Sequence, residues 1–205
     1  LILERYIKIL EKDLAKVSNC YKEIEKTALN DFRTNDKKYI KNLAYTSDIY
    51  QVRMYSVFLF GYLSQDEEVL KFLKEKVSQD THWRVQEILA KSFDEFCKNK
   101  GYDRSLTIID EWLQNENPNT RRAATEGLRL WTGRPYFKEY PKEATKRLSK
   151  LRQDKSEYVR TSVGNALKDI SKKYPELIIE ELNSWELESK EIKQVYRLAR
   201  KFIDR

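Results

Sequence analysis

Residues 117–131 read NPNTRRAATEGLRLW, and they show most clearly the helical pattern that recurs along the chain. Asn117 can cap the free backbone N–H groups at the start of a helix, and Pro118 suits the first turn, where no donor is needed. Small and apolar residues then recur at helical spacing on one stripe: Thr120, Ala123, Ala124, Gly127, Leu128 and Trp131. The pattern predicts an amphipathic helix that buries this stripe and exposes the arginines on its other side.

The same design occurs four times along the chain. Segments of this kind begin at Val52, Val85, Thr120 and Val159, so the starts lie 33, 35 and 39 residues apart. The fifth and ninth residues of each segment are small or apolar, and the second is arginine in three of them, with Gln86 as the exception. An internal period of this size in a helical pattern predicts an α-solenoid of paired helices.

The domain organisation follows from these repeats. We expect an all-α chain that forms a single domain over residues 1–205. Residues 1–45 would form N-terminal capping helices, residues 46–187 the core repeats and residues 188–205 a C-terminal helix.

The charge balance bears on the partner. Lys and Arg number 40 against 33 Asp and Glu, which gives a net charge of +7 and an isoelectric point near 9.2. This favours an anionic partner, although charged residues also simply solvate the outer faces of helices. Two distant cysteines and no secretory segment predict a reducing, cytoplasmic setting without a disulfide framework or a metal site. No apolar run approaches the length of a membrane span.

Carboxylates are the catalytic candidates, because the sequence has no Gly-rich phosphate loop, metal-ligand motif or activated nucleophile. Glu87, Glu126 and Asp169 stand at offsets +2, +6 and +10 from their segment starts. At about 100° per residue these offsets differ by about 40° each, so all three point toward one open face. Neighbouring helices lie about 8–10 Å apart, so three helices cannot bring all three carboxylates to one atom without strong curvature. The alternative is an ordinary solvated face with pairs such as Glu87 and Lys91.

Basic residues are expected on the same open face, where they could hold the phosphates of a duplex. They are Lys91, Lys98, Arg122, Arg129, Lys168 and Lys172. Trp83 could stack on a base there, or pack at a helix entrance as a hydrophobic staple. His82, the only histidine, is interpreted as structural.

Three strings carry a resemblance to a known family: residues 83–87 (WRVQE), 121–129 (RRAATEGLR) and 157–172 (EYVRTSVGNALKDISK), the last followed by Pro175. They resemble the HEAT-like DNA alkylation repair family, the alkylpurine DNA glycosylases of AlkC/AlkD type, and look closer to the C branch than to the D branch. The resemblance covers roughly residues 45–185. It implies a right-handed α-solenoid of stacked HEAT-like antiparallel helix pairs.

The resemblance also implies a function. Such a protein would be a monofunctional glycosylase that hydrolyses the N-glycosidic bond of cationic N3- or N7-alkylated purines in duplex DNA, without a cofactor or metal. A carboxylate would stabilise the oxocarbenium ion and position a water. Asp169 is the first choice, with Glu126 and Glu87, and the implied partner is double-stranded DNA with alkylated bases.

One departure from the family's pattern concerns the aromatic residue that would press on the lesion. Where the family would have Pro-Trp, this chain has residues 131–135 (WTGRP), so this aromatic is displaced or absent. Trp83 and Trp131 are the candidates for base or sugar contact, and Arg134 joins the DNA-binding set. Two alternatives remain: a non-catalytic relative that binds damaged, bent or branched DNA, and a HEAT-type protein scaffold. We expect a monomer in a prokaryotic cytoplasm, associated with the nucleoid.

Overall fold

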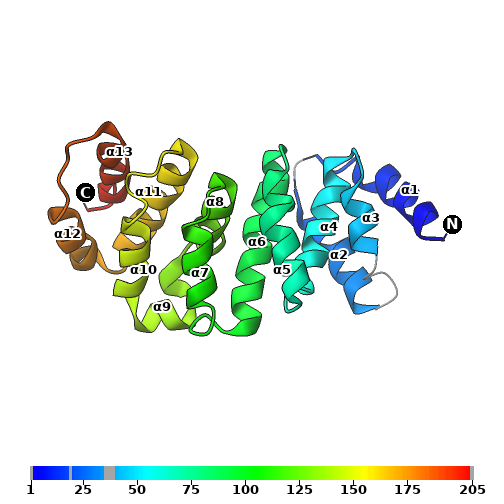
Figure 1. Cartoon of the computed structure of the whole chain (residues 1–205), viewed down its shortest axis with the longest axis horizontal. Coiled ribbons are helices and arrows are strands. Elements are labelled where there is room, and N and C mark those ends of the chain that lie inside the picture. Colours follow the sequence, from blue (N-terminus) through cyan, green and yellow to red (C-terminus); the bar gives the residue numbers. More distant parts are fainter. Residues whose placement is uncertain (1, 19, 35–39, 204–205) are drawn as a thin grey trace. The chain divides into compact units, whose positions relative to one another are not determined.

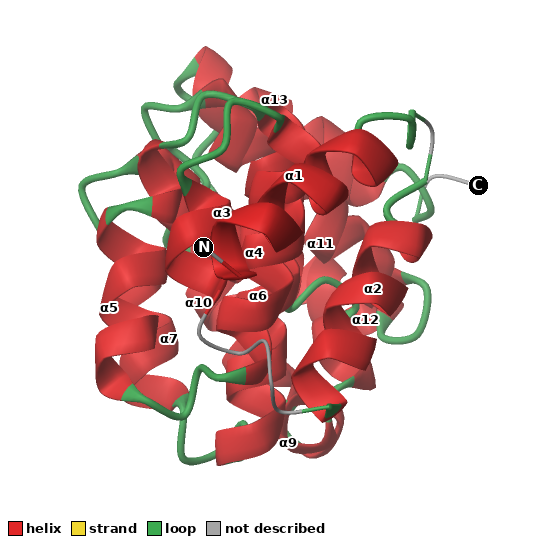
Figure 2. Ribbon diagram, turned by 90° about the vertical axis from the view of Figure 1, so that its right-hand side faces the viewer, coloured by secondary structure: helices red, strands yellow, loops and turns green. Residues whose placement is uncertain are grey.

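The structure is a computed structural model that describes residues 2–18, 20–34 and 40–203. Over these residues the chain forms thirteen α-helices and no strand, so the expected all-α class is confirmed (Figures 1 and 2). No helix in the described ranges is long and apolar enough to cross a membrane. The chain divides into two compact units, residues 1–99 and 100–205, and each is described by itself.

The first unit is built around its fourth helix. It contains α1 (Ile2–Leu14), α2 (Lys22–Arg33), α3 (Lys41–Tyr45), α4 (Tyr50–Tyr62), α5 (Glu67–Glu75) and α6 (Trp83–Lys100). Helix α4 packs against α2 and α3 and buries nearly every side chain, because its sequence is apolar all round. Helix α6 approaches α4 closely at Gly61, where an added Cβ would lie 2.7 Å from the Ser92 hydroxyl oxygen.

The second unit is built around α11. It contains α7 (Leu106–Leu113), α8 (Pro118–Gly127), α9 (Pro135–Glu139), α10 (Pro141–Ser149), α11 (Glu157–Ser171), α12 (Pro175–Asn183) and α13 (Lys190–Arg200). Helix α11 contacts both α8 and α13 (Figure 1). Its close approach to α13 depends on Gly164, where an added Cβ would lie 2.6 Å from the Leu198 Cβ. Trp112, Trp131 and Phe137 are the largest side chains of this unit's core.

The recurring arginine explains why the repeat keeps its register. In Arg121, one guanidinium nitrogen donates to the carbonyls of Asn115 and Glu116, just before its helix, at 2.8 and 2.9 Å. The Nε and the other terminal nitrogen donate to the two carboxylate oxygens of Asp154, which precedes α11, at 2.7 Å each. Arg121 therefore joins one helix entrance to the next, and this bidentate geometry is one that lysine cannot reproduce.

The other repeats use the same device. Arg53 binds the carbonyls of Ser47 and Asp48 and the carboxylate of Asp80, whereas Arg160 binds the carbonyls of Asp154 and Lys155. Gln86, the exception in sequence, donates its amide to the carbonyls of Val77 and Asp80. The second position of the repeat is thus a structural position in all four copies.

The helix that contains residues 117–127 ends earlier than expected. Asn117 does cap α8, accepting from the backbone N–H of Asn119 at 2.9 Å, but the helix stops at Gly127. Leu130 has φ 61° and ψ 43°, the left-handed conformation, which breaks the helical path before Trp131. The expected boundaries at residues 45 and 187 stay predictions. Residues 1, 19, 35–39, 204 and 205 of those segments lie outside the described residues.

Candidate DNA-binding surface

Two of the three predicted carboxylates come together in the second unit. Asp169 of α11 accepts from the Arg129 Nε at 3.1 Å and from the Lys172 Nζ at 3.0 Å. Glu126 of α8 lies 3.8 Å from a terminal nitrogen of the same Arg129. The sequence predicted Glu126, Asp169 and Arg129 on one face, and in the structure Arg129 lies between the two carboxylates. Glu87 is an exposed residue of α6 and belongs to the first unit.

Asp169 is held tightly by its partners. Only 5% of its side chain is exposed, whereas the side chain of Arg129 is 48% exposed. Burial alone would raise the pKa of Asp169, but the hydrogen bonds from Lys172 and Arg129 outweigh burial and lower the pKa below its usual value. Asp169 is therefore ionised at neutral pH, with both oxygens bonded to cations of the protein.

An aromatic side chain lies beside this cluster. The ring of Phe202 is 4.6 Å from the Lys172 Nζ and 6.0 Å from the Lys168 Nζ. Lys168 also donates to the Asn165 side-chain oxygen at 2.8 Å. The two lysines that the sequence assigned to DNA phosphates are thus positioned by the protein itself. Phe202 could not be predicted from the sequence, because a cation–π contact between distant segments leaves no spacing pattern.

The predicted residues of the first unit lie along α6. Lys91 and Lys98 are exposed; the Lys91 Nζ lies 4.4 Å from the Tyr21 ring centroid and the Lys98 Nζ lies 3.4 Å from Glu95. Trp83 is 55% exposed, and the Arg84 guanidinium lies 5.1 Å from its ring centroid. Trp83 therefore presents an open aromatic surface with a cation beside it.

His82 has the structural environment that the sequence suggested. Its ring stacks on Tyr50 with centroids 3.8 Å apart and an interplanar angle of 9°. Burial, followed by the nearby charge of Arg53, lowers the pKa of His82. Its Nδ1 accepts from the backbone N–H of Arg84 at 3.3 Å. The histidine is thus neutral at pH 7 and fixes the entrance of α6.

Trp131 is a core residue, which corrects its prediction as a base or sugar contact. Its side chain has no exposed surface and packs on Phe137 with ring centroids 4.9 Å apart. The indole N–H donates to the carbonyl of Thr125 at 3.2 Å. The left-handed Leu130 turns the chain and directs Trp131 inward, so the indole faces no solvent. Arg134, predicted to bind DNA, makes a hydrogen bond within the protein: a terminal nitrogen of its guanidinium donates to the carbonyl of Gly127 at 3.4 Å.

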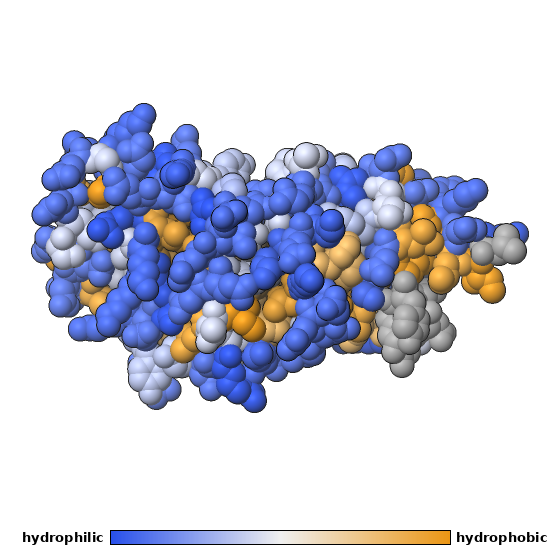
Figure 3. All heavy atoms as spheres, in the orientation of Figure 1, coloured by the Kyte–Doolittle hydropathy of each residue, from blue (hydrophilic) through white to orange (hydrophobic). Residues whose placement is uncertain are grey.

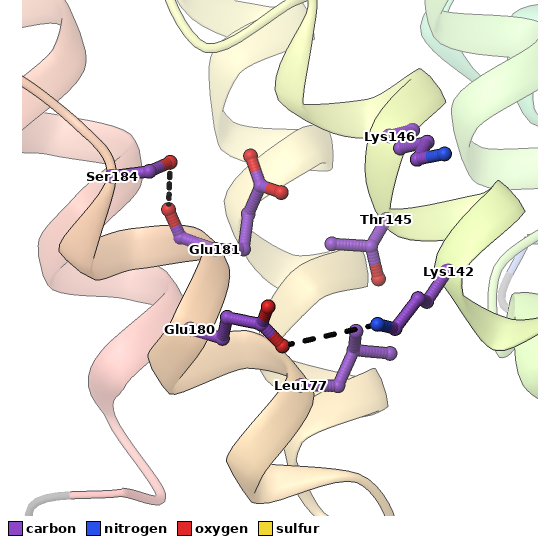
Figure 4. A pocket seen from close by; sticks show the side chains of 7 residues that line it. All are labelled: Lys142, Thr145, Lys146, Leu177, Glu180, Glu181 and Ser184. Carbon is purple, nitrogen blue, oxygen red and sulfur yellow. Dashed lines mark hydrogen bonds and ion pairs between the residues drawn. The ribbon is translucent and has the colours of Figure 1, made fainter.

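A separate pocket of about 240 Å³ lies between α10 and α12 and contains none of the predicted residues (Figure 4). Side chains of both charges line it, and the Lys142 Nζ lies 4.0 Å from Glu180. This balance of charges gives the pocket no preference for a polyanion. Within the described ranges, no group of three or more His, Cys, Asp or Glu side chains could hold a metal ion.

The sequence of this chain matches a known protein family. The profile of a family described as "DNA alkylation repair enzyme" matches residues 4–201, nearly the whole chain. The chain belongs to this family. Its HEAT-like α-solenoid fold, which the sequence predicted, is confirmed by solved structures of DNA alkylation repair proteins.

The similar structures place the chain within the DNA alkylation repair family. AlkD2 from Streptococcus mutans is 60% identical, with a TM-score of 0.97 over 99% of this chain and 100% of that one. The glycosylase AlkC from Pseudomonas fluorescens, solved with DNA that contains an abasic site analogue, is 23% identical. Its TM-score is 0.53 over 90% of this chain and 62% of that one, so this similarity supports the fold alone. The two identities do not support the expected closeness to the C branch.

A relative from Bacillus subtilis (strain 168), YhaZ, is 33% identical over 117 residues. The match covers 51% of this chain but only 33% of the relative, so the chain spans about one third of that protein.

Proposed function

We propose that this chain binds double-stranded DNA during the repair of alkylation damage, chiefly through the phosphate backbone. Phosphate contacts from lysine and arginine supply most of the affinity of a protein that does not read bases. The observation that carries the proposal is the set of exposed lysines and arginines on or just after α6, α8 and α11 in a member of this repair family, together with a net charge of +7. Among the described residues, exposed Lys91 and half-buried Arg122 make no ion pair, and exposed Lys98 makes one, with Glu95.

Hydrolysis of the N-glycosidic bond of cationic N3- or N7-alkylated purines is the second candidate function. The family description and the ionised state of Asp169 favour it. The burial of Asp169 between Arg129 and Lys172 opposes it, because a carboxylate that stabilises an oxocarbenium ion must reach the sugar. Trp131, the candidate aromatic contact of the second unit, is fully buried and offers no surface to a base or sugar. The geometry therefore favours binding without hydrolysis, as in the non-catalytic alternative.

A salt titration tests DNA binding. The logarithm of the association constant for a fluorescent duplex should fall linearly with the logarithm of salt concentration, with a slope near −0.9 for each phosphate contact. Lys98→Ala should make this slope about 0.9 shallower. Lys146→Ala is a matched control, because Lys98 and Lys146 are 65% and 68% exposed and each pairs with a glutamate three residues earlier. No measurable duplex binding, or an equal effect of both variants, would contradict the proposal.

Base release tests hydrolysis. Wild-type protein and Asp169→Asn are incubated with DNA that contains 7-methylguanine or 3-methyladenine, and the free base is measured by chromatography. We expect both proteins to match spontaneous loss. Release by the wild type that exceeds spontaneous loss, and that Asp169→Asn abolishes, would establish the glycosylase function instead.

A further inference from the structure

The N-terminal ends of α8 and α11 carry an exposed aromatic ring beside an arginine. Tyr158, in the first turn of α11, is 66% exposed, the largest exposure of any tyrosine among the described residues. The Arg122 guanidinium, from the first turns of α8, lies 5.1 Å from its ring centroid. The two helices pack together in the second unit, so this pair is a fixed feature of one compact body.

The hydrogen-bonding groups of this pair are unused. In the part of the chain that the structure describes, the Arg122 side chain makes neither a hydrogen bond nor an ion pair, and neither does the Tyr158 hydroxyl. Arg121 is adjacent to Arg122 in sequence, but its guanidinium donates hydrogen bonds to four acceptors within the protein. The five N–H donors of Arg122 are therefore available, and its guanidinium lies over a ring that is largely exposed. This arrangement suits an external ligand that has both an anionic oxygen and a flat surface.

We propose that an unpaired base of a DNA strand stacks on Tyr158 while the neighbouring phosphate binds Arg122. Stacking on aromatic side chains and charge-assisted hydrogen bonds from arginine are the two contacts by which proteins hold unpaired nucleotides. Ser156 makes no side-chain cap to α11, so the N–H groups of the first turn add positive potential at the same place. Glu157 is an acidic residue in the same turn and offsets part of this potential, so Arg122 supplies the main positive charge for the phosphate.

This inference deepens the proposed function, on which it rests, and it specifies a DNA form. Contacts to the phosphates of a perfect duplex need no unpaired base, whereas the Arg122–Tyr158 pair requires one. The protein should therefore distinguish two duplexes that differ only in one extrahelical nucleotide.

The experiment measures the Kd by fluorescence anisotropy for a fully paired duplex and for the same duplex with one unpaired thymine at its centre. Wild-type protein should bind the bulged duplex about tenfold more tightly, as expected for one stacked base. Tyr158→Ala should lower the affinity for the bulged duplex to that of the paired one and leave the paired duplex unaffected. Equal binding of both duplexes by the wild type, or a preference that survives Tyr158→Ala, overturns the inference.

Two variants separate stacking from other losses. Tyr158→Phe keeps the ring and should keep the preference. Tyr140→Ala is a matched control, because Tyr140 is 48% exposed but has a carboxylate as its neighbour: Glu139 raises the pKa of its hydroxyl. It should also keep the preference. Loss of the preference in either variant, with helical content unchanged by circular dichroism, would overturn the role of the Tyr158 ring.

The phosphate contact is tested through salt dependence. Arg122→Ala should weaken binding of the bulged duplex and make its salt slope about 0.7–0.9 shallower, whereas Tyr158→Ala should leave that slope unchanged. An unchanged slope in Arg122→Ala overturns the phosphate contact. Binding of the paired duplex without preference for the bulge rejects this inference alone, while absence of binding to either duplex rejects the proposed function as well.

Discussion

The two ends of the α8–α11 pair use their charged residues in opposite ways. At the C-terminal end, Arg129 and Lys172 hold Asp169, which is almost fully buried. At the N-terminal end, Arg122 has no such partner and lies over the exposed ring of Tyr158. Similar cations on one pair of helices therefore have different roles, because only those whose N–H donors have no partner within the protein are free to bind a ligand. We therefore assign stability to the C-terminal end and recognition to the N-terminal end.

The largest expected effect is that of Trp131→Ala, at the C-terminal end. Removing this buried indole leaves a cavity and breaks its hydrogen bond to Thr125, so the free energy of unfolding should fall by about 3–5 kcal/mol. Urea denaturation followed by circular dichroism measures this change. Trp83→Ala, at an exposed tryptophan, should cost far less, and equal losses would show that Trp131 is not a core residue in solution.

The next largest effect is expected for Arg121→Ala, because Arg121 has an ion-pair partner and its neighbour Arg122 has no comparable one. Arg121→Ala removes one partner of a buried ion pair and leaves Asp154 unpaired, which should cost about 3 kcal/mol of unfolding free energy. The same denaturation experiment measures it. A small loss in Arg121→Ala would mean that the connection between helix entrances does not stabilise the fold.

A smaller effect tests the ionised state of Asp169. A carboxyl whose pKa is lower in the folded state stabilises the protein above its unfolded pKa of about 3.9, and loses this contribution as pH falls through the folded value. Wild-type stability should therefore fall by about 1 kcal/mol more than that of Asp169→Asn between pH 5 and pH 2, since its half-exposed partners are screened by solvent. Thermal melts over this range measure the difference. Parallel pH profiles of the two proteins would contradict the ion-pair interpretation.

The smallest effect on stability is expected at the N-terminal end. Arg122→Ala removes no hydrogen bond or ion pair of the described residues, so unfolding should change by no more than about 0.5 kcal/mol. Its DNA affinity should change instead. A loss comparable with that of Arg121→Ala would reverse the assignment of recognition to this end.

Much of the fold was predictable, because helical periodicity and the repeat are local properties of the sequence. The residues 117–131 pattern gave the start of α8 correctly, since Asn117 caps it as expected. Its end was wrong, because the left-handed Leu130 interrupts the helix and no glycine or proline at that position signals the turn. The same turn buries Trp131, so an error in backbone conformation became an error in the predicted site.

The amino-acid sequence alone was enough for the fold class and the repeat, because apolar spacing fixes which face of each helix is buried. The family followed from three strings of residues that resemble it. The sequence also predicted that Glu126 and Asp169 lie on one face. Which charged groups form hydrogen bonds and ion pairs inside the protein depends on how the helices pack, and the sequence did not reveal it. Arg121 and Arg122 are neighbours in the chain, but they project about 100° apart around α8. One therefore meets Asp154 of the next repeat and the other meets Tyr158, and partners that lie more than thirty residues away leave no signal beside either arginine.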